Sequence, residues 1–168
     1  MAQDIAMSLA VECRLIDKYM FMCSHRISES EYDKIDRRRM DVEAQLAATT
    51  PWTNAGASAL LRTAARWLLA AEPQEWAIAH LRTHARRLGR GERGVIVKLR
   101  SLFVTLGEEP TCDECAHGGG WSPENKAAIL AILANVIEYA ESYKAAPEAW
   151  AQRKLLWQDI LATASPRN

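Results

Sequence analysis

The residues best suited to chemistry lie in one short stretch of the chain. Cys112 and Cys115 form a Cys-x-x-Cys pair, and His117 follows two residues later, ahead of three consecutive glycines. Thiolates and imidazoles are zinc ligands, and the glycines would permit a tight turn that directs both sulfur atoms at one ion. A closed zinc site needs four ligands, whereas this stretch supplies three. The spacing therefore predicts half of a zinc-binding motif.

The fourth ligand would come from elsewhere in the chain, or from the same loop of a second subunit. The other cysteines and histidines are Cys13, Cys23, His25, His80 and His84. Among these we favour His25, since it lies just past the end of the first expected helix. The alternative interpretation is a connecting loop whose thiols stay reduced, and we prefer it because half a motif matches many loops by chance. A redox pair is disfavoured because its first thiol would need a helix N-terminus, and none is expected before Ser122.

His80 and His84 are four residues apart, a spacing that places two imidazoles on one helix face and could serve a metal. A zinc protease of the His-Glu-x-x-His type would have glutamate directly after the first histidine, and Leu81 occupies that position. The alternative interpretation is a pair of partly exposed histidines beside Trp76. We prefer it, because pairs with this spacing arise easily by chance.

The segment from His80 to Arg100 is strongly basic, with Glu92 as its single acidic residue. A surface of this kind can contact successive phosphates, which predicts nucleic-acid binding through Arg82, Arg86, Arg87, Arg90, Arg93 and Arg100. The alternative, which we prefer, is a solvated or internally paired face that the nearby acidic stretch neutralises, with Glu108, Glu109, Asp113 and Glu114.

Three of the six tryptophans lie at expected loops or away from the apolar stripes: Trp52, Trp76 and Trp121. We expect them to be exposed, and exposed tryptophan and arginine are the residues that interface hot spots use. The leading functional interpretation is therefore a small helical accessory protein that binds a protein partner or forms a homo-oligomer. Nucleic-acid binding and a structural zinc site are the alternatives.

The elements that position these residues are expected to be helices. Apolar residues recur every three or four positions in nearly every segment, and alternation of period two is weak. We expect an all-α fold: a single domain over residues 1–168, with six or seven helices and one long Cys/Gly-rich loop at 107–121. The expected helices cover 5–23, 28–48, 60–71, 73–88, 92–106, 123–143 and a stretch that opens at Pro147.

Two of these helices, at 28–48 and 92–106, have local sequence features that bear on their prediction. Ser28 and Glu31 have the spacing of a capping box, and the helix that follows them has a thin apolar face, so we expect most of it to face water. In the 92–106 segment, Val95 to Val97 favour a strand, but the spacing from Ile96 to Leu106 favours a helix, which we expect.

Composition narrows the function further. Lys plus Arg and Asp plus Glu each number 21, so the whole chain does not have the charge of a polyanion binder. No apolar run approaches the roughly 20 residues that span a bilayer, and no secretory signal is apparent. Four cysteines without a disulfide-rich spacing fit the reducing cytoplasm. No motif with catalytic spacing is present, which disfavours an enzyme.

The run 43–56 contains the end of one expected helix, with the sequence Ala-Ala-Thr-Thr-Pro, and the start of the next, with Thr53-Asn54-Ala55-Gly56. It resembles a segment of small uncharacterised proteobacterial proteins that carries Ala-Ala-Thr-Pro and Thr-x-Ala-Gly. This chain departs from that pattern by an additional threonine before Pro51 and by Trp52. The resemblance implies a bacterial origin and assigns neither an activity nor a site.

Overall fold

The computed structural model describes residues 4–70, 75–92, 94–111 and 121–145. These residues form an all-α bundle of six helices: α1 (Ile5–Cys23), α2 (Glu29–Ala48), α3 (Asn54–Ala70), α4 (Glu75–Gly89), α5 (Ile96–Glu108) and α6 (Pro123–Ala145). The expected all-α fold is therefore confirmed, and the ambiguous 92–106 segment is helical from Ile96. The helix expected from Pro147 lies outside the described residues, as does most of the Cys/Gly-rich loop.

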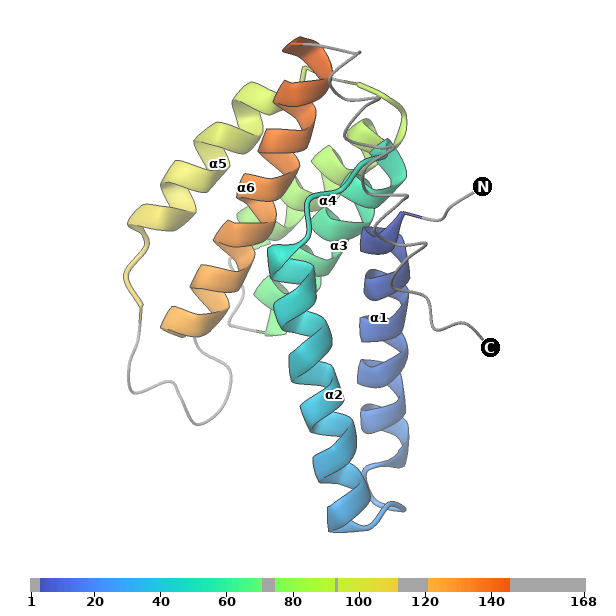
Figure 1. Ribbon diagram of the computed structural model, residues 1–168. Helices are drawn as coiled ribbons and strands as arrows, with labels where there is room; N and C mark the ends of the chain where they lie inside the picture. The colour runs from blue at the N-terminus through green and yellow to red at the C-terminus, as the bar shows by residue number, and fades with distance from the viewer. Residues whose placement is uncertain (1–3, 71–74, 93, 112–120, 146–168) are drawn as a thin grey trace.

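Helix α3 is the centre of the bundle. It packs against α1, α4 and α6, while α2 packs against α1 and α6, and α5 packs against α6 (Figure 1). The helices bury one shared core in which leucine and isoleucine predominate, including Leu46, Leu60, Leu61, Leu68, Leu81, Leu88, Leu99, Leu106, Ile129 and Leu133. Because packing of apolar faces supplies most helix stability, this core fixes the relative positions of the six helices.

A buried carboxylate ties the start of α1 to the turn before α3. Asp4 is 3% exposed and caps α1 by accepting a hydrogen bond from the Ala6 amide at 3.0 Å. Its other oxygen accepts from the Thr53 amide at 2.9 Å and from the Thr53 hydroxyl at 2.7 Å. A Cβ at Gly56 would overlap this carboxylate, so the Thr-x-x-Gly spacing has a structural reason here. Further along both helices, Asp17 of α1 lies 3.4 Å from Arg66 of α3. Because the starts of the two helices are also in contact, α1 and α3 run parallel.

The outer halves of α1 and α2 extend beyond the rest of the bundle (Figure 1). No residue from 15 to 41 is buried, and in α2 only Val42 and Leu46 reach the core. The expectation that α2 mostly faces water is thus confirmed, and so is its capping box, in which Ser28 and Glu31 exchange hydrogen bonds of 3.1 and 3.3 Å. We call residues 15–41 the projecting hairpin.

Candidate functional site

An open groove of about 820 Å³ is lined by α1, α3 and α4. Five arginines surround it: Arg14 from α1, Arg62 and Arg66 from α3, and Arg82 and Arg86 from α4. The remaining lining residues are mostly small or apolar, namely Met7, Ala10, Val11, Ala55, Ser58, Ala59, Thr63 and Gly89. We call this feature the arginine groove.

Local spacing and helix packing together produce the arginine groove. Arg62 and Arg66 are four residues apart, as are Arg82 and Arg86, so each pair lies on one helix face. Gly89 lies beside Ser58, where a Cβ on the glycine would approach the serine hydroxyl to 3.4 Å. That close approach brings the arginine-bearing face of α4 alongside that of α3.

The arginine groove is positively charged. None of its lining residues is acidic. Arg66 has a carboxylate neighbour, Asp17, with 3.4 Å between Nη1 and Oδ2. The other four arginines are exposed and form no ion pair within the described part of the chain. Four guanidinium groups are therefore available to bind an anionic ligand.

The described arginines of the predicted basic segment have four different surroundings. Arg82 and Arg86 line the arginine groove, whereas Arg87 donates to Glu92 at 2.7 Å. Arg100 donates to Glu141 of α6 at 2.7 Å. Arg90 is exposed outside the groove lining, and Arg93 lies outside the described residues. Nucleic-acid binding by this segment remains a prediction, but its arginines do not share one face.

Three of the groove arginines, Arg14, Arg62 and Arg66, were not predicted from the sequence. Arg62 and Arg66 repeat the four-residue spacing of Arg82 and Arg86, which was the available signal. The spacing of residues within one helix does not show which neighbouring helix those residues will face, because helix packing depends on contacts between residues distant in sequence.

Of the four predicted zinc ligands, the structure describes only His25. Cys112, Cys115 and His117 lie outside the described residues. His25 is exposed at the end of the projecting hairpin, and its Nε2 accepts a hydrogen bond from Arg26 Nε at 3.0 Å. Zinc binding therefore stays a prediction.

The expectation of three exposed tryptophans was wrong for Trp52 and Trp121, which are each 7% exposed. Both lie in turns directly before helices, and these turns fold onto the core rather than away from it. Trp76 is 42% exposed and contacts the ring of His80 edge-on, with 6.2 Å between ring centroids. It is the one predicted interface tryptophan that could contact a partner.

His80 and His84 lie close together, with 5.8 Å between ring centroids. His84 is only 3% exposed, which differs from the partly exposed position expected for it. Burial lowers the pKa of His84, and the nearby His80, Arg87 and Lys98 lower it further. No third metal-ligating side chain joins the pair among the described residues. We interpret His84 as a neutral imidazole packed at the side of the core.

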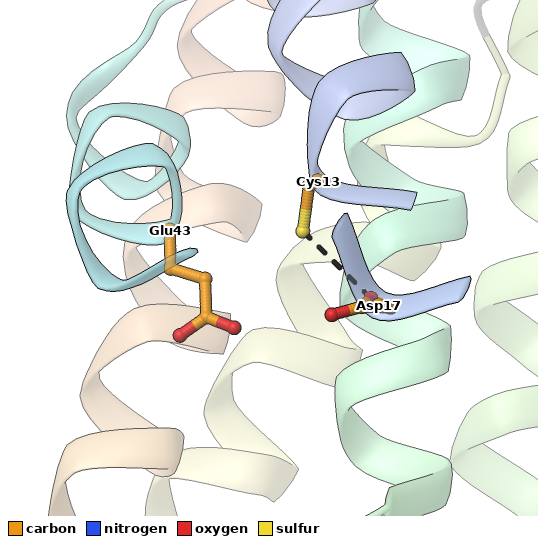
Figure 2. A group of neighbouring side chains, drawn as sticks. All are labelled: Cys13, Asp17 and Glu43. Carbon is orange, nitrogen blue, oxygen red and sulfur yellow. Dashed lines mark hydrogen bonds between the residues drawn. The ribbon is translucent and has the colours of Figure 1, made fainter. Parts of the chain in front are cut away.

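A second polar cluster joins Cys13 and Asp17 of α1 to Glu43 of α2 (Figure 2), with ligand atoms within 4.8 Å of one another. The Cys13 thiol donates to Asp17 at 3.9 Å, and burial, followed by Asp17, raises the pKa of Cys13 to about 11. Arg66 lies 3.4 Å from Asp17, and Arg39 lies 3.5 Å from Glu43. These guanidinium groups balance the carboxylates, so we interpret the cluster as an ion-pair network between helices.

Comparisons with family models, curated proteins and solved structures find no match to this chain. Within the described ranges, none of the helices combines the length and the apolarity required to cross a bilayer. Function is therefore inferred from the arginine groove and the projecting hairpin.

Proposed function

We propose that this protein acts by binding a protein partner, with the projecting hairpin as the docking surface. The observation that carries the proposal is the absence of any buried residue between 15 and 41, although this stretch is rich in large apolar side chains. Leu15, Tyr19 and Met22 follow one another along α1 at helical spacing, and each is at least 46% exposed. Phe21, which lies on a different face of α1, is 88% exposed.

The hairpin is richer in exposed large apolar side chains than the rest of the described chain. Six of the eleven large apolar side chains exposed in the described part of the chain lie in the hairpin: Leu15, Tyr19, Phe21, Met22, Tyr32 and Met40. Scattered apolar residues are normal on a surface, whereas a group of them marks an interaction site. Full burial of one such side chain contributes about 1.5–3 kcal/mol, so a partner that covers several would bind measurably.

The charges of the hairpin indicate what kind of partner fits it. Residues 15–41 contain six Lys or Arg and six Asp or Glu, so the surface has no net charge. A partner would therefore be recognised through apolar contact. An apolar helix, or a pair of helices that completes a four-helix bundle with α1 and α2, has the required chemistry. A second copy of this chain is one such partner.

Site-specific photo-crosslinking in cells of the source organism tests the proposal. A photoreactive phenylalanine analogue would replace Phe21 in the hairpin or, as the control, Val97 of α5, which is also well exposed at 73%. We expect a discrete crosslinked protein from position 21 and not from position 97. If the crosslinked species is a dimer of this chain, the partner is a second copy. Equal or absent crosslinking at the two positions would refute the proposal.

A further inference from the structure

We infer that the arginine groove binds an acidic, amphipathic helix of a partner protein. The inference rests on the proposed function in one respect, that the ligand is a protein. It uses a different surface, because none of the residues that line the groove belongs to the projecting hairpin.

Charge complementarity identifies the ligand as an anion. The groove holds five arginines and no acidic lining residue, and only Arg66 has a carboxylate partner among the described residues. Guanidinium groups bind carboxylates through paired, charge-assisted hydrogen bonds. The like-charged pairs Arg62 with Arg66 and Arg82 with Arg86 also repel each other, and an acidic ligand would relieve that repulsion.

The apolar part of the groove lining, which we call the floor, indicates that the ligand also has an apolar face. Met7, Ala10 and Val11 of α1 and Ala55 and Ala59 of α3 form much of the lining. A small charged molecule would leave this apolar surface in water. A ligand with aspartate or glutamate along both edges of an apolar stripe would contact the arginines and cover the floor together.

The dimensions of the groove favour a helix. Helices α1 and α4 both pack against α3 without packing closely on each other. At the usual spacing of about 8–10 Å between packed helices, α1 and α4 can lie about 16–20 Å apart across α3. A helix with its side chains is about 10–12 Å wide. The alanines and Gly89 present little bulk, so a helix can approach closely. Laying an amphipathic helix into such a groove is a recurring mode of peptide recognition.

The same residues disfavour a nucleic acid as the ligand. Binding of single strands relies on aromatic side chains that stack with bases, and no aromatic residue lines the groove. A duplex backbone could contact the arginines but would leave the apolar floor uncovered. The chain also has no net charge, whereas nucleic-acid-binding domains are usually basic overall.

Fluorescence anisotropy with defined probes tests the inference on the purified full chain. The first probe is a labelled helical peptide of about 18 residues, with leucines spaced to form one stripe and glutamates on both sides of it. The second has glutamine in place of every glutamate, and the third is a single-stranded oligonucleotide of similar length. We expect the glutamate peptide to bind at least about tenfold more tightly than the glutamine peptide. We also expect its affinity to fall as salt is added.

A matched pair of variants assigns that binding to the groove. Arg62→Glu/Arg86→Glu reverses two groove charges, and Arg90→Glu/Lys98→Glu makes the same change in net charge at exposed residues outside both the groove lining and the projecting hairpin. We expect the first variant to weaken binding of the glutamate peptide by at least about tenfold and the second to leave it nearly unchanged. Arg62→Gln/Arg86→Gln, with circular dichroism of every variant, separates loss of charge from loss of fold.

Three results would overturn the inference: no binding of the glutamate peptide, equal binding of the two peptides, or tighter binding of the oligonucleotide that depends on Arg62 and Arg86. The proposed function is tested separately, since crosslinking from position 21 does not use the groove. If crosslinking succeeds while the peptide fails to bind, the protein-binding function stands and the acidic helix is excluded as the groove's ligand.

Discussion

The His84 imidazole has an unusual environment for a titratable side chain. It is 3% exposed, and its Nδ1 has no hydrogen-bond partner among the described residues. Burial lowers the pKa of His84, and the positive charges of His80 and Arg87 on α4 and of Lys98 on α5 lower it further. The folded protein therefore favours the neutral form of this ring over its protonated form.

This environment predicts a loss of stability in mild acid. Below the ordinary histidine pKa of about 6.5, the unfolded chain takes up a proton at His84 more readily than the folded chain does. The free energy of unfolding should therefore fall as the pH decreases from about 6.5 towards the lower pKa of the folded state, with no contribution from His84 above that range. Urea denaturation at about pH 7.5 and about pH 5.5 measures this difference.

Two variants separate His84 from other titrating groups. In His84→Gln, the difference in stability between the two pH values should shrink. In His25→Gln, which replaces an exposed histidine, that difference should remain. An unchanged pH dependence in His84→Gln would show that the buried ring does not control it.

Features of single residues were predicted correctly from the sequence where they depend on neighbours close in the chain. The capping box of Ser28 and Glu31 was predicted and is confirmed, because its hydrogen bonds span three residues. The burial of Trp52 was not predicted. The turn that contains Trp52 is held by Asp4, which lies 48 residues earlier in the chain and whose carboxylate accepts a hydrogen bond from the Trp52 amide at 3.2 Å. A polar contact over such a distance along the chain leaves no periodic pattern in the sequence.

At the scale of helices, the sequence predicted which segments are helical but not which faces meet. The apolar spacing of α5 correctly outweighed the strand preference of Val95 to Val97, because leucines at helical intervals reach the core. The basic segment was treated as one surface, whereas α4 presents Arg82 and Arg86 to the groove and α5 presents Arg100 to α6. The arginines have different surroundings because α4 packs against α3 whereas α5 packs against α6.

The arginine pairs of the groove predict an increase in stability on charge reversal. Like charges four residues apart destabilise a helix by about 0.2–0.5 kcal/mol, and Arg62 lies four residues before Arg66. In Arg62→Glu this repulsion becomes attraction in the favourable orientation, so we expect a gain of about 0.5–1 kcal/mol. Thermal unfolding should shift upward by about 1–4 °C.

Arg37→Glu is a suitable comparison, because it removes the same charge from an exposed helical position. Arg37 lies four residues from both Asp33 and Asp41, so the glutamate would create two repulsive spacings. We expect this variant to be less stable than the parent. A loss of stability in Arg62→Glu as well would mean that repulsion among the groove arginines is negligible.

At the scale of the whole molecule, stability is distributed unevenly. Helix α3 contacts three other helices and buries Leu60, Leu61 and Leu68 completely. The projecting hairpin has no buried residue and extends beyond the rest of the bundle (Figure 1). Its contacts outside α1 and α2 include the ion pair of Asp17 with Arg66 of α3. Segments with few buried apolar contacts open at a lower free energy than the core does. The surface proposed for partner binding is therefore also the one that gains most order from a partner.

Amide hydrogen exchange followed by mass spectrometry should reveal this gradient. We expect amides of α2 from 29 to 41 to exchange faster than those from 42 to 48, where Val42 and Leu46 are buried, and both to exchange faster than the centre of α3. The comparison within α2 is the critical one, since one helix is measured in one experiment. Uniform protection along α2 in the isolated chain would mean that the hairpin is already covered. In that case, its apolar side chains would not be free for another protein, and the site of partner binding would have to be sought at the arginine groove.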